Sequence, residues 1–183
     1  MNAREVLLLG DRRLRQRAAE VIDFDESAFR DDLAALAATL DAFRKRHGFG
    51  RAIAAPQIGV SRRFIAMNLG EGTLFLVNPV ITWKSDETFT MWDDCMSFPE
   101  LLVRVRRVRS FSLAYQDEKG NAKSWERLGI AISELLQHEI DHLDGILAVD
   151  RALDRDSIVM RSLFEQRGEE FVRMVDYVIA PTL

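Results

Sequence analysis

Residues 137–145, QHEIDHLDG, predict a helix around which the rest of the sequence can be arranged. His138 and His142 are four residues apart, so on a helix they share one face and both imidazoles can reach one metal ion. Glu139 follows the first histidine and can hold a water as a general base. The alternative interpretation is two histidines one helical turn apart without a metal. We favour the metal site.

Two histidines leave such a site incomplete, because a catalytic zinc-type site uses three protein ligands and keeps one position open. One extended protease pattern would put a third histidine at the position of Ala148. Another class of protease takes a glutamate from a later helix, for which Glu165, Glu169 and Glu170 are available. The only cysteine, Cys95, follows a predicted strand. Beside a histidine pair that lacks a partner, we favour Cys95 as the third ligand over an inert buried residue.

Outward from this helix, the pattern predicts an α+β fold of short, mostly antiparallel strands packed around the central H-E-x-x-H helix, with an N-terminal helix and a C-terminal helix. Helical spacing of apolar residues covers 27–47, 130–145 and 156–176. Short runs rich in β-branched and aromatic residues, separated by turn residues such as Asn78-Pro79, predict strands at 64–67, 74–77, 80–83, 88–92, 102–115 and 122–125.

Composition narrows the possible functions. The 183 residues suit one domain, spanning 1–183, and the scattered prolines mark no linker. A single cysteine excludes an intramolecular disulfide and a zinc site of several thiolates. The net charge of −4 argues against a protein whose whole surface binds nucleic acid. Without an apolar run of roughly 18 residues or a secretory signal, we expect a cytoplasmic protein that does not enter a membrane.

Two further segments carry weaker signals. The stretch GRAIAAPQIG, residues 50–59, combines small residues with one amide side chain, Gln57, which can donate a hydrogen bond to an oxyanion. The alternative for this stretch is a close-packed turn. A basic cluster holds four arginines, which we expect on the solvated face of a strand rather than against ribosomal RNA: Arg104, Arg106, Arg107 and Arg109.

Taken together, the segments around Gln57, Cys95 and His138 resemble, in order and spacing, the signatures G-x-G-x-A-A-x-Q, E-G-C-x-S and H-E-x-x-H of the peptide deformylase family. The resemblance covers nearly the whole chain. It implies that one divalent metal ion is held by Cys95, His138 and His142, with Glu139 as the acid/base. It further implies that the side chain of Gln57 and the backbone N–H of Met96 stabilise an oxyanion.

The activity implied by the resemblance is hydrolysis of the N-formyl group from the N-terminal methionine of a nascent peptide, with release of formate. The ion would be Fe(II) in cells, whereas Zn, Ni or Co could occupy the purified protein. The expected partner is the formylated nascent peptide, with the ribosome as a further one. We expect neither DNA nor a membrane as a partner, and we expect a monomer.

Several residues depart from the family pattern near the expected substrate pocket. Of the residues assigned there, Gly50 matches, while Ala52 replaces a second glycine, Asp93 stands where glutamate is usual, and Glu134 stands where an apolar residue usually faces the methionine side chain. Further departures are Asp94 in place of a glycine, Met96 in place of a leucine and Leu102 in place of an arginine.

A carboxylate and the loss of a glycine at the pocket rim would disfavour a plain apolar substrate side chain, because an unpaired buried charge costs several kcal/mol. Alternatives to the deformylase are an amidase with another N-acyl substrate, a non-catalytic, metal-stabilised relative that binds a peptide or the ribosome, and an H-E-x-x-H protease.

Overall fold

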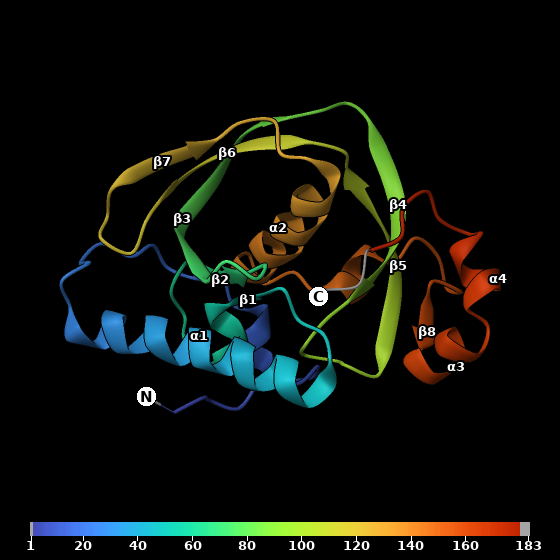
Figure 1. The fold of residues 1–183 in the computed structure, drawn as a ribbon, viewed down its shortest axis with the longest axis horizontal. Helices are drawn as coiled ribbons and strands as arrows, with labels where there is room; N and C mark the ends of the chain where they lie inside the picture. The colour runs from blue at the N-terminus through green and yellow to red at the C-terminus, as the bar shows by residue number, and fades with distance from the viewer. Residues whose placement is uncertain (1, 180–183) are drawn as a thin grey trace.

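The computed structural model describes residues 2–179 and has the α+β architecture that the sequence predicts. Helix α2 (Ile130–Leu143) lies at its centre, between a five-stranded sheet and a three-stranded sheet (Figure 1). Its apolar side chains, among them Leu136 and Leu143, are buried against the larger sheet. Gly145 has φ +75°, a conformation that ends the helix and that glycine adopts without strain.

Both sheets are antiparallel, as predicted. The larger has the order β1-β2-β3-β6-β7, and the smaller has the order β4-β5-β8. The strands are β1 (Ala52–Ala54), β2 (Phe64–Asn68), β3 (Thr73–Lys84), β4 (Thr88–Asp94), β5 (Leu101–Val108), β6 (Phe111–Gln116), β7 (Ala122–Trp125) and β8 (Ile158–Met160).

Two predicted strand boundaries are wrong. Asn78-Pro79 does not end a strand, because β3 continues through it with a shift in its register against β6. Asn78 has φ +50°, and its side chain exchanges hydrogen bonds with the backbone of Val21, which replaces the pairing lost at this irregularity. Conversely, the run 102–115 is not one strand: it divides into β5 and β6, which belong to different sheets.

Helix α1 (Ser27–His47) has the bounds that the sequence predicts. Its buried side chains, such as Phe29, Leu36 and Leu40, pack on β1 and β2. Gly48 ends the helix at φ +76°. Short 3-10 turns at Arg12–Arg15, Ala55–Ile58 and Ala148–Arg151 complete the framework around the core.

The C-terminal helix predicted over 156–176 forms only between 161 and 172, and in two pieces. The β-branched and apolar residues Ile158–Met160 form β8, which pairs with the free edge of β5, and two short helices follow, α3 (Arg161–Gln166) and α4 (Gly168–Val172). Pairing with an open sheet edge satisfies backbone groups that an isolated helix of this length would leave at its ends. Between residues 2 and 179, no helix combines the length and the apolarity that crossing a membrane requires.

Candidate metal centre

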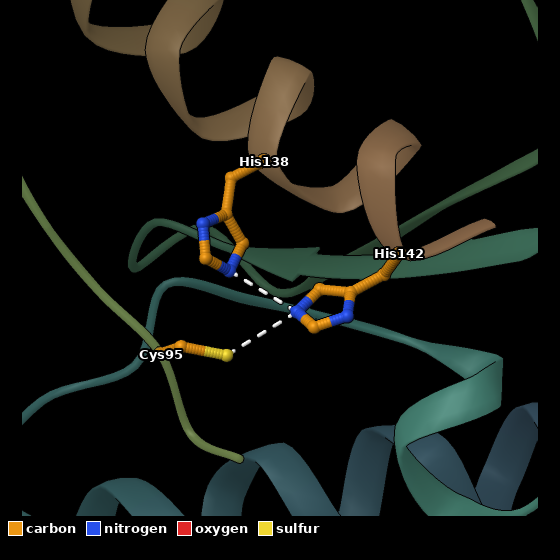
Figure 2. Close-up of side chains that lie close together, drawn as sticks. All are labelled: Cys95, His138 and His142. Atoms are coloured by element: carbon orange, nitrogen blue, oxygen red, sulfur yellow. Dashed lines mark hydrogen bonds between the residues drawn. The ribbon is translucent and has the colours of Figure 1, made fainter. Parts of the chain in front are cut away.

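Three side chains from two parts of the chain converge below α2 (Figure 2). His138 and His142 come from adjacent turns of α2, and Cys95 comes from the loop that follows β4. The Nε2 atom of His142 lies 3.2 Å from the Nε2 atom of His138 and 3.2 Å from the Sγ atom of Cys95. All three residues are buried. The sequence-predicted ligands are therefore brought together.

This donor set fits a metal ion. In a tetrahedral site with metal–nitrogen bonds of about 2.0–2.1 Å, two ligand nitrogens lie roughly 3.3 Å apart, close to the spacing between His138 and His142. Two nitrogens and one sulfur form a set that suits several transition metals. The three protein ligands leave one position for water or substrate, which is the arrangement of a catalytic site.

Asp93 binds the Nδ1 atom of His138, the ring nitrogen that does not face the other donors. Its Oδ2 atom accepts a hydrogen bond from the Nδ1 atom of His138 at 3.0 Å and one from Arg107 at 2.8 Å. Because a carboxylate can only accept, Nδ1 carries the proton and the lone pair of Nε2 is directed at the other two ligands. Burial alone would raise the pKa of Asp93, but His138 and Arg107 outweigh it and lower that pKa.

Arg107 corrects one sequence prediction, because it is not on a solvated face. It is only 4% exposed, and its guanidinium pairs with both Asp93 and Asp141, at 2.8 and 2.5 Å. Asp141 also pairs with Arg151. The signal that would have placed Arg107 is the alternation of β5, since positions of equal parity share a face and Val103 and Val105 are buried.

Glu139 is nearly fully buried and lines the same cavity as the donors Cys95 and His138. Its Oε2 atom has no hydrogen-bond partner among the residues that the structure describes. Burial raises the pKa of Glu139 to about 7, and a cation bound beside it would lower that value. A carboxyl group with one free oxygen and a pKa near neutrality is suited to accepting and returning a proton.

Gln57 and Met96 lie beside Cys95. The turn Ala55–Ile58 fixes Gln57, whose Oε1 atom accepts a hydrogen bond from the backbone of Ala54 at 2.9 Å. Its Nε2 atom lies 3.7 Å from the Sγ atom of Cys95 and 3.2 Å from Ser97. Met96 is buried and lines the cavity beside Cys95. Both residues are therefore close enough to contact a substrate that reaches the donors.

The cavity beside the donors has a volume of about 260 Å³ and contains a buried ion pair. Glu134, 1% exposed, accepts a hydrogen bond from Arg51 at 2.5 Å. The expectation of an unpaired charge here was wrong, because the arginine of the small-residue stretch supplies its counter-ion. Burial raises the pKa of Glu134 to about 7, against the opposing effect of Arg51. Gly50 and Ala52 flank Arg51 and also line the cavity.

Asp94 and Leu102, two further departures from the family pattern, have partners in the C-terminal part of the chain. Asp94 forms an ion pair with Arg161 at 3.1 Å, and that guanidinium also lies 4.3 Å from the ring centre of Phe49. Leu102 is buried in an apolar cluster with Trp92 and Phe171. Neither substitution therefore leaves an unsatisfied group beside the donors.

The protease alternatives find no support in the geometry. Among residues 2–179, the one cluster of metal-binding side chains is Cys95, His138 and His142. The three candidate glutamates are all exposed, on the C-terminal helices: Glu165, Glu169 and Glu170. Ala148 is buried in an apolar cluster that also contains Cys95.

Comparison with known proteins agrees with the site. Residues 3–157 match the family model described as polypeptide deformylase. Peptide deformylases of Thermotoga neapolitana and of a Parafrankia species are 35% and 39% identical to this chain. The first alignment covers 85% of this chain and 91% of the relative, and the second covers 86% and 82%.

Two crystal structures extend the likeness to the fold. The peptide deformylase of Thermotoga maritima has a TM-score of 0.76 at 32% identity and covers 84% of this chain and 100% of its own. That of Synechococcus elongatus, in complex with actinonin, has a TM-score of 0.78 at 28% identity and covers 92% and 87%. The resemblance found in the sequence is confirmed: this chain belongs to the polypeptide deformylase family.

Proposed function

We propose that this protein is a peptide deformylase, a metal-dependent hydrolase that removes the formyl group from the N-terminal methionine of nascent peptides and releases formate. The observation that carries this function is the convergence of Cys95, His138 and His142 beside a cavity that Glu139 also lines. An amidase acting on another N-acyl group gains no support from the family match.

Cys95, His138 and His142 would hold one divalent ion, Fe(II) in cells or Zn, Ni or Co in the purified protein. When bound, such an ion polarises a carbonyl oxygen and acidifies water. Asp93 keeps the His138 ring in the tautomer and orientation that this ligand role needs. We assign Asp93 to this positioning role in addition to its place in the lining of the cavity.

Glu139 would move the proton. Its free Oε2 atom takes the proton from the attacking water, whose oxygen bonds to the formyl carbon. As the bond between that carbon and the nitrogen breaks, Glu139 returns the proton to the leaving amine. The Nε2 amide of Gln57 and the backbone N–H of Met96 would stabilise the negative charge that develops on the formyl oxygen.

Substrate binding would involve the wall formed by Gly50, Ala52 and Glu134, the last as an internally neutralised pair with Arg51. A single domain over 1–183, a monomeric state, a cytoplasmic location and contact with the ribosome stay predictions. Of the basic cluster that could touch ribosomal RNA, Arg107 is buried beside Asp93 and is not available for that contact.

The experiment is formate release from formyl-Met-Ala-Ser by protein loaded with Fe(II) or Ni(II) without oxygen. Glu139→Gln should lower kcat by about 10²–10⁴-fold, because it removes the proton carrier while preserving shape. The matched control is Glu165→Gln, an exposed carboxylate on α3, which should keep wild-type kcat. No formate from wild-type protein that carries one metal ion per chain would overturn the proposal.

A further inference from the structure

The C-terminal segment, residues 158–179, begins where the match to the family model ends, so that match assigns it no role. It nevertheless forms one wall of the cavity that the donors Cys95 and His138 line. The side chains that it contributes are all aliphatic or aromatic: Phe164, Val172, Val175, Tyr177, Val178 and Ile179. In Figure 1, α3 and α4 lie beside β4 and β5, and the chain that follows α4 returns to β4.

Specific contacts hold the segment in place. The Nε1 atom of Trp92 donates a hydrogen bond to the backbone oxygen of Phe171 at 2.8 Å. The carboxylate of Asp176 accepts hydrogen bonds from the backbone and the hydroxyl of Thr90, at 2.9 and 2.8 Å. At its start, the segment is fastened by the pairing of Arg161 with Asp94. These contacts tie both ends of the segment to β4, so the wall has a defined position relative to Cys95.

Two of the wall residues are also exposed to solvent. Val172 is 37% exposed and Val178 is 51% exposed, although both line the cavity. The donors Cys95 and His138, which line the same cavity, are by contrast buried. A peptide whose formyl group reaches the donors must leave the cavity toward solvent, and its following residues would pass the exposed valines. Apolar side chains there would bury surface against them.

We propose that the wall formed by Val172, Val175 and Val178 selects the residues that follow the first methionine, favouring apolar over charged side chains. The inference rests on the proposed deformylase function and names a substrate preference of the same site. The wall carries no charged side chain, and the lining carboxylates Asp94 and Glu134 are each paired with an arginine. A charged residue against this surface would lose hydration without gaining a partner.

The test compares kcat/KM for two peptide series, formyl-Met-Xaa-Ser and formyl-Met-Ala-Xaa, with leucine, aspartate or lysine at Xaa. In at least one series the wild-type protein should prefer leucine by about tenfold, the scale of a small apolar contact. Val178→Asp should shift the preference toward lysine by about fivefold and Val178→Lys toward aspartate by a similar factor, as expected of exposed ion pairs. Val172 receives the same two substitutions.

The matched controls are Met174→Asp and Met174→Lys. Met174 is 38% exposed in the same segment but does not line the cavity, so the ranking of peptides should not change. The shifts should fall on KM, because the wall lies away from the donors. A reversal of charge preference between the Asp and Lys variants cannot come from loosened packing alone.

Equal kcat/KM for all peptides in the wild type, or identical rankings in the Val178→Asp and Val178→Lys proteins, would overturn the selection role while leaving the deformylase function intact. The same shifts in the Met174 variants would also overturn it, because they would come from long-range charge. If the wild type released no formate from any peptide, the proposed function and this inference would both fail.

Discussion

Asp93 and His138 are joined by a hydrogen bond of 3.0 Å between a carboxylate oxygen and Nδ1, and this bond sets the direction of the histidine's other nitrogen. Arg107 holds the same carboxylate oxygen from the opposite side, at 2.8 Å. The donor His138 is therefore oriented by residues that are not metal donors themselves. Such outer partners contribute strongly to metal affinity in proteins.

Loss of this support should weaken metal binding. Asp93→Asn removes the charge that holds His138 and Arg107, so metal affinity should fall by about 10–100-fold, measured by competition with a chelator of known affinity. Asp156→Asn is the control, because that carboxylate is 78% exposed and remote from the donors. Equal affinities for the wild type and Asp93→Asn would contradict the positioning role.

The ion pair between Arg51 and Glu134 should show strong coupling. Arg51→Met leaves a buried carboxylate without a partner and should lower the free energy of unfolding by about 3–5 kcal/mol in urea denaturation. The double variant Arg51→Met/Glu134→Met should recover most of that loss, since an apolar pair of similar volume needs no counter-charge. Should the two variants be equally unstable, the pair would not be the reason for the loss.

Gly145 tests how closely the end of helix α2 packs against the backbone of Arg15. Gly145 and Gly48 have nearly equal φ values, +75° and +76°, but a Cβ atom at 145 would lie 2.6 Å from the backbone oxygen of Arg15, whereas at 48 it would meet nothing within 4 Å. Both alanine variants carry the cost of a left-handed conformation. Gly145→Ala should lower the free energy of unfolding, measured by urea denaturation, by about 1–3 kcal/mol more than Gly48→Ala does. Equal losses of unfolding free energy would mean that the backbone at Arg15 can move away from the new Cβ atom without cost.

The attachment of the C-terminal segment should depend on pH through Asp176. Hydrogen bonds from Thr90 lower the pKa of Asp176 below its ordinary value of 3.8. Because the folded-state pKa is the lower one, the contact stabilises the segment above the ordinary value and is lost as the pH falls through the lowered pKa.

Hydrogen exchange measures this loss directly. Amides 173–179, corrected for intrinsic rates, should exchange faster as the pH falls from about 5 to about 3. Asp176→Asn, which cannot ionise, should remove that dependence. A wild-type protein and a variant with the same pH profile would contradict the assignment.

How far the sequence predicts the structure depends on how local each feature is. Helix α1 was predicted with its bounds, because its apolar spacing is unbroken and Gly48 ends it. The two histidine ligands follow from helical periodicity alone. Cys95 followed because the histidine pair lacked a ligand and the chain contains one thiol.

The features that the sequence did not reveal depend on contacts between distant residues. The partner of Glu134 is Arg51, 83 positions away, and nothing local marks the two as neighbours. Residues 158–160 pair with the edge of β5 as a strand, although their apolar spacing resembles that of a helix. Arg107 is the exception, because strand alternation already indicated its inward face.

We expect hydrolysis of the formyl group to depend on one ion held by Cys95, His138 and His142. The most direct measurement titrates metal-free protein with Ni(II) without oxygen and follows formate release from formyl-Met-Ala-Ser. The release should rise in proportion to added metal and level off at one ion per chain, and Cys95→Ser should abolish or shift that titration. Formate release without metal would contradict the metal dependence of the reaction. An unchanged titration in Cys95→Ser would contradict the role of Cys95 as a ligand.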